Sequence, residues 1–234
     1  MRQRSHQGVP EDNKQSMPEN QENNKAYSAD QIAAIERSLS PNRLNHYLLE
    51  AKGDKNLAIR LYERNTELSE ALYGVIQGLE VTLRNAIHRS LQKGLNVEDW
   101  YDQIQLEEPE TEALVQAKKA VADAKKPVTA PRVIAKINFG FWVRLTASTY
   151  EKRLWVPHLH KVFPVRMVRS LLYKRLHNIK DLRNKIAHHE RISSRDTNRE
   201  YEEILETIRW ICPITYEWVK STNRFEKIRL RPRS

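Results

Sequence analysis

Cysteine, glycine and long apolar runs are all scarce in this chain. The 234 residues contain one cysteine, Cys212, so neither an internal disulfide nor a cysteine-rich zinc site can form, which suits a reducing cytoplasm. Six glycines are too few for a turn-rich sandwich or barrel. The longest apolar run, residues 139–143, falls far short of the roughly 20 residues of a membrane helix. Residues 1–7 lack the apolar core of a secretory signal. We therefore expect a cytoplasmic protein without a membrane partner.

Positive charge is abundant, but it is confined to one segment. The chain carries a net charge of +10. Residues 152–195 contain 12 Lys/Arg against 2 Asp/Glu, a net of +10, whereas the flanking residues 1–151 and 196–234 carry −1 and +1. The same segment holds five of the eight histidines. A concentrated basic field indicates a polyanionic partner, and nucleic acid is the first candidate.

The domain organisation follows from composition. Residues 1–27 are almost entirely polar and cannot bury enough surface to offset the entropy of ordering, so we predict a disordered polar tail. Residues 28–222 are expected to form a single all-α domain, and residues 223–234 a basic C-terminal tail. The length and the 39% hydrophobic content allow one good core, or at most two small ones.

Helical spacing is found almost throughout residues 28–222, and no segment shows sustained strand alternation. Ser28 or Asp30 can cap a first helix, Pro41 begins a second that runs to Gly53, and Asp54 caps a third. The longest candidate, residues 66–93, has an apolar stripe made of Leu68, Leu72, Val75, Ile76, Leu79, Leu83, Ile87 and Leu91.

Four further segments complete the predicted helical bundle. Residues 113–126 are expected to form an exposed helix, and residues 133–142 an apolar segment. Residues 164–187 and 195–220 are expected to be helical, the last with a break at Pro213. The fold class is therefore all-α, a helical bundle with additional short helices.

Residues 171–190 contain the pattern that points to chemistry. At about 100° per residue, Arg183 falls within the apolar face formed by Leu172, Leu176, Ile179 and Ile186. A guanidinium there needs a partner. Two interpretations remain open: a structural salt bridge, for which Glu80 is the plausible partner, or an anion-binding arginine in a cleft.

His188 follows Arg183 by five residues and lies roughly 140° around an unbroken helix. Either the helix ends before His188 and the chain turns it inward, or His188 faces a second subunit. Asn184 lies one turn earlier and could orient the imidazole. Metal-free RNA cleavage needs a group that accepts the 2′-hydroxyl proton and a cation that stabilises the phosphorane-like charge. Histidine and arginine suit these two roles.

Residues 182–190 also carry a resemblance to a known family. Their Arg-x(4)-His pattern with a polar residue after the arginine resembles the signature of Abi-like (abortive infection) proteins of the AbiD/AbiF type, which belong to the HEPN superfamily. Supporting segments are residues 40–44, 79–85, 138–142, 154–157 and 210–213. The resemblance extends over about residues 38–219.

This resemblance implies a helical fold that dimerises and acts as a metal-independent endoribonuclease in antiphage defence, with no cofactor. Arg183 and His188 would be catalytic, and Asn184, His189, Glu80 and Arg84 would support them. Residues expected to bind RNA are Arg175, Lys180, Lys185 and Arg191. Expected partners are an RNA substrate, a second copy in a homodimer, and an antitoxin or companion noncoding RNA.

Two other functions compete with the ribonuclease. A zinc hydrolase is disfavoured because Ser193 stands where a His-Glu-x-x-His motif beginning at His189 would need its final histidine. A non-catalytic RNA-binding or regulatory module is the stronger alternative, since Tyr173, Trp155 and Phe163 accompany the basic residues and could stack on bases. For most of the tryptophans, including Trp142, Trp155, Trp210 and Trp218, we expect core or interface positions instead.

Overall fold

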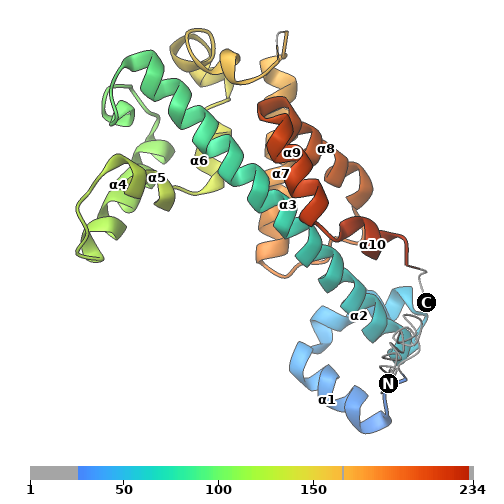
Figure 1. Ribbon diagram of the computed structural model, residues 1–234. Helices are drawn as coiled ribbons and strands as arrows, with labels where there is room; N and C mark the ends of the chain where they lie inside the picture. The colour runs from blue at the N-terminus through green and yellow to red at the C-terminus, as the bar shows by residue number, and fades with distance from the viewer. Residues whose placement is uncertain (1–25, 165, 232–234) are drawn as a thin grey trace, which may run out of the picture. The chain divides into compact units, whose positions relative to one another are not determined.

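The computed structural model describes residues 26–164 and 166–231, and the predicted polar tail lies outside them except for Ala26 and Tyr27. Within the described residues all regular structure is helical, as predicted (Figure 1). The described residues divide into two compact units, residues 26–62, and residues 63–164 with 166–231. Each unit is described by itself.

The first unit contains α1 (Ala29–Leu39), α2 (Pro41–Glu50) and the start of α3 (Lys55–Leu95). Ser28 caps α1 as predicted: its hydroxyl accepts from the Gln31 N–H at 3.3 Å, and the Gln31 side chain accepts from the Ser28 N–H at 2.9 Å. Helix α2 ends at Glu50 rather than at Gly53, which adopts φ +88° in the turn before α3. A small cluster of Tyr47, Ala51 and Ala58 is buried here.

Helix α3 is one continuous helix of 41 residues, which corrects the prediction of two separate helices. Asp54 caps it as expected, with Oδ1 accepting from the Leu57 N–H at 3.0 Å. No proline or loop signal interrupts the sequence between residues 55 and 93, so the helix has no reason to end near Thr66. All eight residues of the predicted apolar stripe are buried.

In the second unit, α4 (Glu108–Asp123), α5 (Ala130–Lys136) and α6 (Phe139–Arg144) precede a run of short helical turns, which are Ser148–Tyr150, the π-helix Glu151–Trp155 and Leu159–Val162. A further short turn, Trp100–Asp102, follows α3. Helix α4 is less exposed than predicted, because Glu110, Leu114, Ala117 and Val121 are buried. The Glu110 carboxylate accepts from the Tyr150 hydroxyl at 2.6 Å and pairs with Arg144, which compensates its burial.

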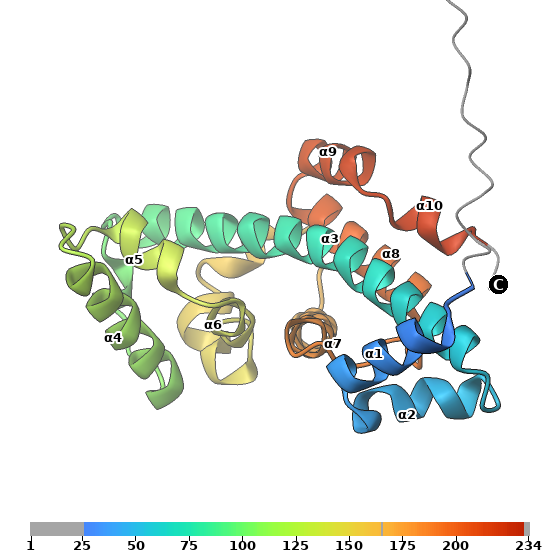
Figure 2. The ribbon, with the colours of Figure 1, turned by 90° about the horizontal axis from the view of Figure 1, so that it is seen from below.

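The remaining helices are α7 (Arg169–Ala187), α8 (Thr197–Ile211), α9 (Pro213–Thr222) and α10 (Phe225–Arg229). The predicted break at Pro213 is confirmed, since α8 ends at Ile211 and α9 begins at the proline. Residues expected as a basic tail instead form α10, because Phe225 and Ile228 are buried and Phe225 stacks on Tyr201 at 4.4 Å. Helices α7 to α9 lie alongside α3 (Figures 1 and 2).

Candidate functional site

Helix α7 positions the residues predicted to act on RNA. Its apolar face consists of Leu172, Leu176, Ile179, Leu182 and Ile186, all of which are buried. These contacts fix the rotation of the helix, so its basic residues lie along the flanks and the outer side. The functional residues near its C-terminus are therefore presented by a rigid element rather than by a loop.

Arg183 lies beside this face and contacts α3. Its Nε donates to Oε1 of Glu80 at 3.1 Å, and the two side chains are 31% and 26% exposed. This ion pair corresponds to the salt bridge considered from the sequence. The pair is only partly buried, so it links α7 to α3 without the large desolvation cost of a fully buried pair. It occupies one edge of the guanidinium, while in the described residues neither terminal nitrogen has a partner.

Helix α7 ends in two backbone hydrogen bonds at the motif itself. The His189 N–H donates to the Ile186 carbonyl at 3.0 Å, and the Glu190 N–H donates to the Lys185 carbonyl at 2.8 Å. This is a Schellman arrangement, and His189 takes the left-handed position, with φ +56°. A non-glycine residue is uncommon at this position. The strained turn is thus located in the candidate site.

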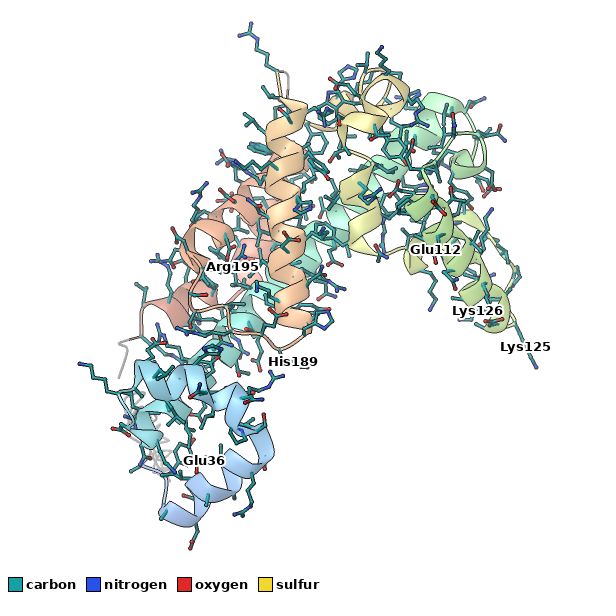
Figure 3. The ribbon with its side chains drawn as sticks, turned by 180° about the vertical axis from the view of Figure 1, so that it is seen from behind. Glu36, Glu112, Lys125, Lys126, His189 and Arg195 are labelled. Carbon is teal, nitrogen blue, oxygen red and sulfur yellow. The ribbon has the colours of Figure 1, made fainter. Side chains whose placement is uncertain are left out.

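The helix ends before His188, as one sequence interpretation required, but the side chain is not turned inward. His188 is the C-cap residue of α7 and is exposed. His189, which follows it, is exposed as well (Figure 3). Asn184 is also exposed, and its carbonyl accepts from the His188 N–H at 3.0 Å. Among the described residues, no hydrogen bond joins His188 to the side chain of either Asn184 or Arg183.

The four predicted RNA-binding residues already have neighbours. Arg175 donates to Glu206 at 2.7 Å, and Lys180 lies 3.5 Å from Asp181. Arg191 donates to the Ser193 hydroxyl at 2.7 Å.

Lys185 is 2.9 Å from Glu190 and lowers the pKa of that carboxyl, with a smaller contribution from His188. Arg84, expected to support the site, donates through Nε to Asn85 at 3.1 Å. Arg175, Lys180 and Lys185 are therefore each held in an ion pair and Arg191 contacts a hydroxyl, so a polyanion must compete with these contacts.

The aromatic residues are distributed differently from the binding-module interpretation. Trp155 and Phe163 stack on each other at 5.7 Å and are buried, so neither ring is available to a base. Trp142 is also in the core, as expected. Trp218 is 64% exposed, whereas Trp210 is half-buried and packs against the core.

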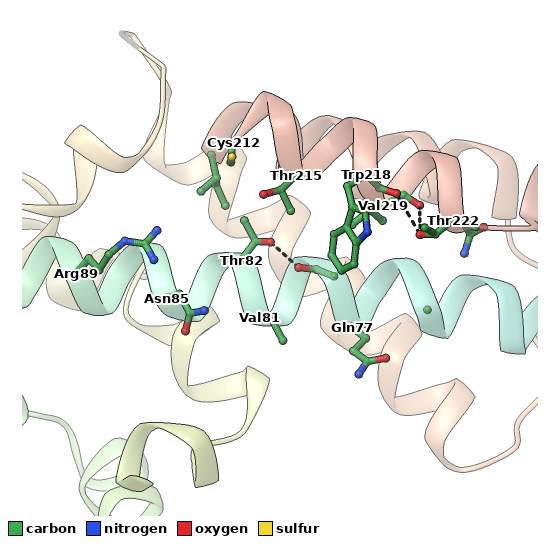
Figure 4. A pocket seen from close by; sticks show the side chains of 14 residues that line it. Gln77, Val81, Thr82, Asn85, Arg89, Cys212, Thr215, Trp218, Val219 and Thr222 are labelled. Atoms are coloured by element: carbon green, nitrogen blue, oxygen red, sulfur yellow. Dashed lines mark hydrogen bonds between the residues drawn. The ribbon is translucent and has the colours of Figure 1, made fainter. Parts of the chain in front are cut away.

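Two grooves were not foreseen from the sequence. One of about 520 Å³ lies between α3 and α9, where Thr215 of α9 is opposite Thr82 of α3 and Trp218 also lines the groove (Figure 4). Cys212 also lines it, and its thiol pKa is lowered by hydrogen bonding to Thr215. Arg89 is the only charged residue of this lining, so the groove lacks the cations that a polyanion needs.

The second groove, of about 540 Å³, lies between α7 and α8. Four cationic residues line it, which are Arg166, Lys174, Arg175 and Arg199. It belongs partly to the basic segment that the charge distribution identified, and Trp210 forms part of its wall. No sequence signal predicted that α7 and α8 would place these residues opposite one another, because α8 lies beyond a separate connection.

Neither a metal-binding cluster nor a membrane-spanning helix is found in residues 26–164 and 166–231. These residues contain no cluster of three or more His, Cys, Asp or Glu side chains arranged to hold a metal ion. None of the described helices is long and apolar enough to cross a membrane.

In comparisons with family models, curated proteins and solved structures, nothing matches this chain.

Proposed function

We propose that this protein is a metal-independent endoribonuclease of the abortive-infection type, with Arg183 and His188 as its catalytic residues. The observation that carries the proposal is their placement on the last turns of the basic helix α7: Arg183 is half-buried and oriented by Glu80, and His188 is exposed at the helix end. A role in antiphage defence rests on the family resemblance of residues 182–190.

The two side chains have complementary roles. His188 accepts the proton of a ribose 2′-hydroxyl, whose oxygen attacks the adjacent phosphorus. The bond from phosphorus to the 5′-oxygen breaks, and that oxygen takes up a proton. The products are a 2′,3′-cyclic phosphate and a 5′-hydroxyl. Arg183 stabilises the charge that develops on the phosphate oxygens.

Glu80 is a positioning residue in this proposal. It accepts from Nε of Arg183, which leaves the two terminal nitrogens directed away from that contact. Those nitrogens can donate two parallel hydrogen bonds to one phosphate. The carboxylate therefore fixes the guanidinium plane without occupying the atoms that bind substrate.

A second copy of the chain would complete the site. Five residues of helix separate Arg183 from His188 by about 7.5 Å along the axis and about 140° around it. One phosphate therefore does not reach both side chains of the same helix easily. In a homodimer, His188 of one copy and Arg183 of the other can converge on one phosphate, and Arg84 adds a cation on the facing helix.

An RNA-binding protein without cleavage is the second candidate. It is favoured by the exposed His188, which has no hydrogen bond to Asn184 or Arg183 in the described residues. Such a protein would use the same basic helix to hold RNA, as part of a defence or toxin–antitoxin system.

Cleavage of RNA in the presence of EDTA separates the two candidates. We expect the wild type to cleave, His188→Ala to bind RNA without cleaving, and His46→Ala to behave as wild type. His46 is an exposed histidine of α2 and serves as the matched control. Loss of wild-type cleavage in EDTA, or persistence of cleavage in His188→Ala, would contradict the mechanism. Binding without any wild-type cleavage would identify the binding protein.

A further inference from the structure

The groove between α7 and α8 is built from two facing helical stripes. On α7, Leu171, Lys174, Arg175 and Asn178 recur at helical spacing and share one side. On α8, Arg199, Glu203 and Trp210 do the same. The ion pair between Arg175 and Glu206, at 2.7 Å, fixes the two helices to each other. The groove is therefore a feature of two packed helices and not of a loop.

Arg175 and Trp210 form a flat platform in this groove. The guanidinium carbon of Arg175 lies 4.4 Å from the centre of the indole ring. Glu206 accepts from Nη1 of Arg175 and holds the guanidinium over the ring. A guanidinium plane and an indole are both surfaces on which a nucleobase stacks.

The charge of the groove favours an anion. Four cationic residues line it, whereas the acidic groups facing them are Glu203, which pairs with Arg199 at 2.9 Å, and Glu206. Arg166 and Lys174 are exposed, and neither has an ion-pair partner in the described residues. These two cations are the ones left for a phosphate.

Apolar surface beside these cations distinguishes the groove from a purely ionic patch. Val168 is 52% exposed and Leu171 is 64% exposed. Asn178 adds an amide that both donates and accepts, which suits a base edge or a 2′-hydroxyl. The bases, sugars and phosphates of a nucleic acid together use cationic, apolar and amide surface. An acidic peptide would use the cations but has no need of the stacked platform.

We propose that the α7–α8 groove binds single-stranded RNA, stacking a base on the Arg175–Trp210 platform and holding a phosphate at Lys174 and Arg166. The choice of RNA as the ligand rests on the proposed function. Lys185 lies on the same side of α7 as Lys174, and fourteen residues of helix, about 21 Å, separate Lys174 from His188. A strand bound in the groove therefore follows α7 towards the site of cleavage.

Binding of a fluorescent oligouridine of about ten nucleotides tests the groove. The variants Lys174→Glu and Lys119→Glu are compared in a His188→Ala background, so that cleavage does not remove the probe. Lys119 is an exposed lysine of α4, outside the groove. We expect Lys174→Glu to weaken binding about tenfold and to reduce the salt slope by about one, and Lys119→Glu to leave both unchanged.

The other outcomes distinguish this proposal from the ribonuclease. Equal RNA binding by both lysine variants would overturn the proposal that the groove binds RNA. Cleavage in EDTA that depends on His188 would still support the proposed function in that case. Weaker binding of polyglutamate by Lys174→Glu, without any loss of RNA binding, would identify a protein-binding groove and overturn the proposal. Loss of RNA binding by Lys174→Glu with no cleavage by the wild type would support the groove and reject the ribonuclease.

Discussion

Two glycines on one side of α3 predict opposite effects of the same substitution. A Cβ added at Gly78 would lie 2.8 Å from Cγ2 and 3.3 Å from Cγ1 of Val219 on α9. A Cβ added at Gly74, one turn earlier, would meet only the Asn223 side-chain nitrogen, at an ordinary 3.5 Å. Val219 is buried and branched at Cβ, so it cannot rotate away freely.

The magnitudes follow from two competing terms. Gly→Ala in a helix interior stabilises by about 1 kcal/mol through helix propensity. At Gly78 this gain is opposed by overpacking, which costs about 1–3 kcal/mol. We therefore expect Gly74→Ala to raise the free energy of unfolding by about 0.5–1 kcal/mol. We expect Gly78→Ala to lower it by about 1 kcal/mol, the balance of the two terms.

Urea unfolding followed by circular dichroism measures both effects. The propensity gain is common to the two variants, so the difference between them reports the contact with Val219. In a Val219→Ala background the clash is removed, and Gly78→Ala should then stabilise. Equal shifts for the two glycine variants, or no rescue by Val219→Ala, would refute the close packing of α9 on α3.

Three further predictions concern the surroundings of the site. Glu80→Gln should lower the free energy of unfolding by about 1 kcal/mol and lower kcat by a larger factor than it changes KM, because Arg183 loses its ionic partner. Glu70→Gln removes a more exposed ion pair, with Arg224, and is the control for both readouts. Asn65→Ala should cost about 1–3 kcal/mol in urea unfolding, since buried Oδ1 accepts from the Ile192 N–H at 2.9 Å, and a loss below 0.5 kcal/mol would contradict this bond. Burial lowers the pKa of His88 below its usual 6.5 in the folded protein. The neutral imidazole therefore contributes fully to stability above pH 6.5, and this contribution is lost as the pH falls below 6.5 through the lowered pKa. His88→Gln should flatten the fall in thermal midpoint between pH 7 and pH 5, and an unchanged slope would argue against this assignment.

Much of the fold was predictable because local signals agree with the packing. The stripe from Leu68 to Leu91 has one helical period and is buried along its whole length. Ser28, Asp54 and Pro213 each act at the helix boundary that their chemistry favours. The continuity of α3 is harder to predict, because the apolar pattern that begins near Leu68 looks like the start of a new helix.

Tertiary partners were harder to predict. The contact of Arg183 with Glu80 could be anticipated because a cation on an apolar face needs an anion. The burial of Glu110 could not, since its partners Arg144 and Tyr150 lie more than 30 residues away in the sequence. The groove between α7 and α8 was missed for the same reason. Spacing within one helix does not reveal which helix it faces.

The geometry of the candidate site could not be predicted from the sequence. The helix end at His188 and the left-handed His189 depend on backbone hydrogen bonds to Ile186 and Lys185. Neither His188 nor His189 is a glycine, so the sequence contains no capping signal at this helix end. The separation of His188 from Arg183 around the helix is the reason that the proposed chemistry uses a second copy of the chain.

End-group analysis of RNA incubated with the protein in EDTA tests whether His188 and Arg183 cleave RNA through its 2′-hydroxyl. We expect fragments with 2′,3′-cyclic phosphate and 5′-hydroxyl ends. We expect no fragments with His188→Ala or with a substrate whose 2′-hydroxyl is removed at the cleaved position. Fragments with 5′-phosphate ends, or cleavage that requires added metal, would contradict this mechanism.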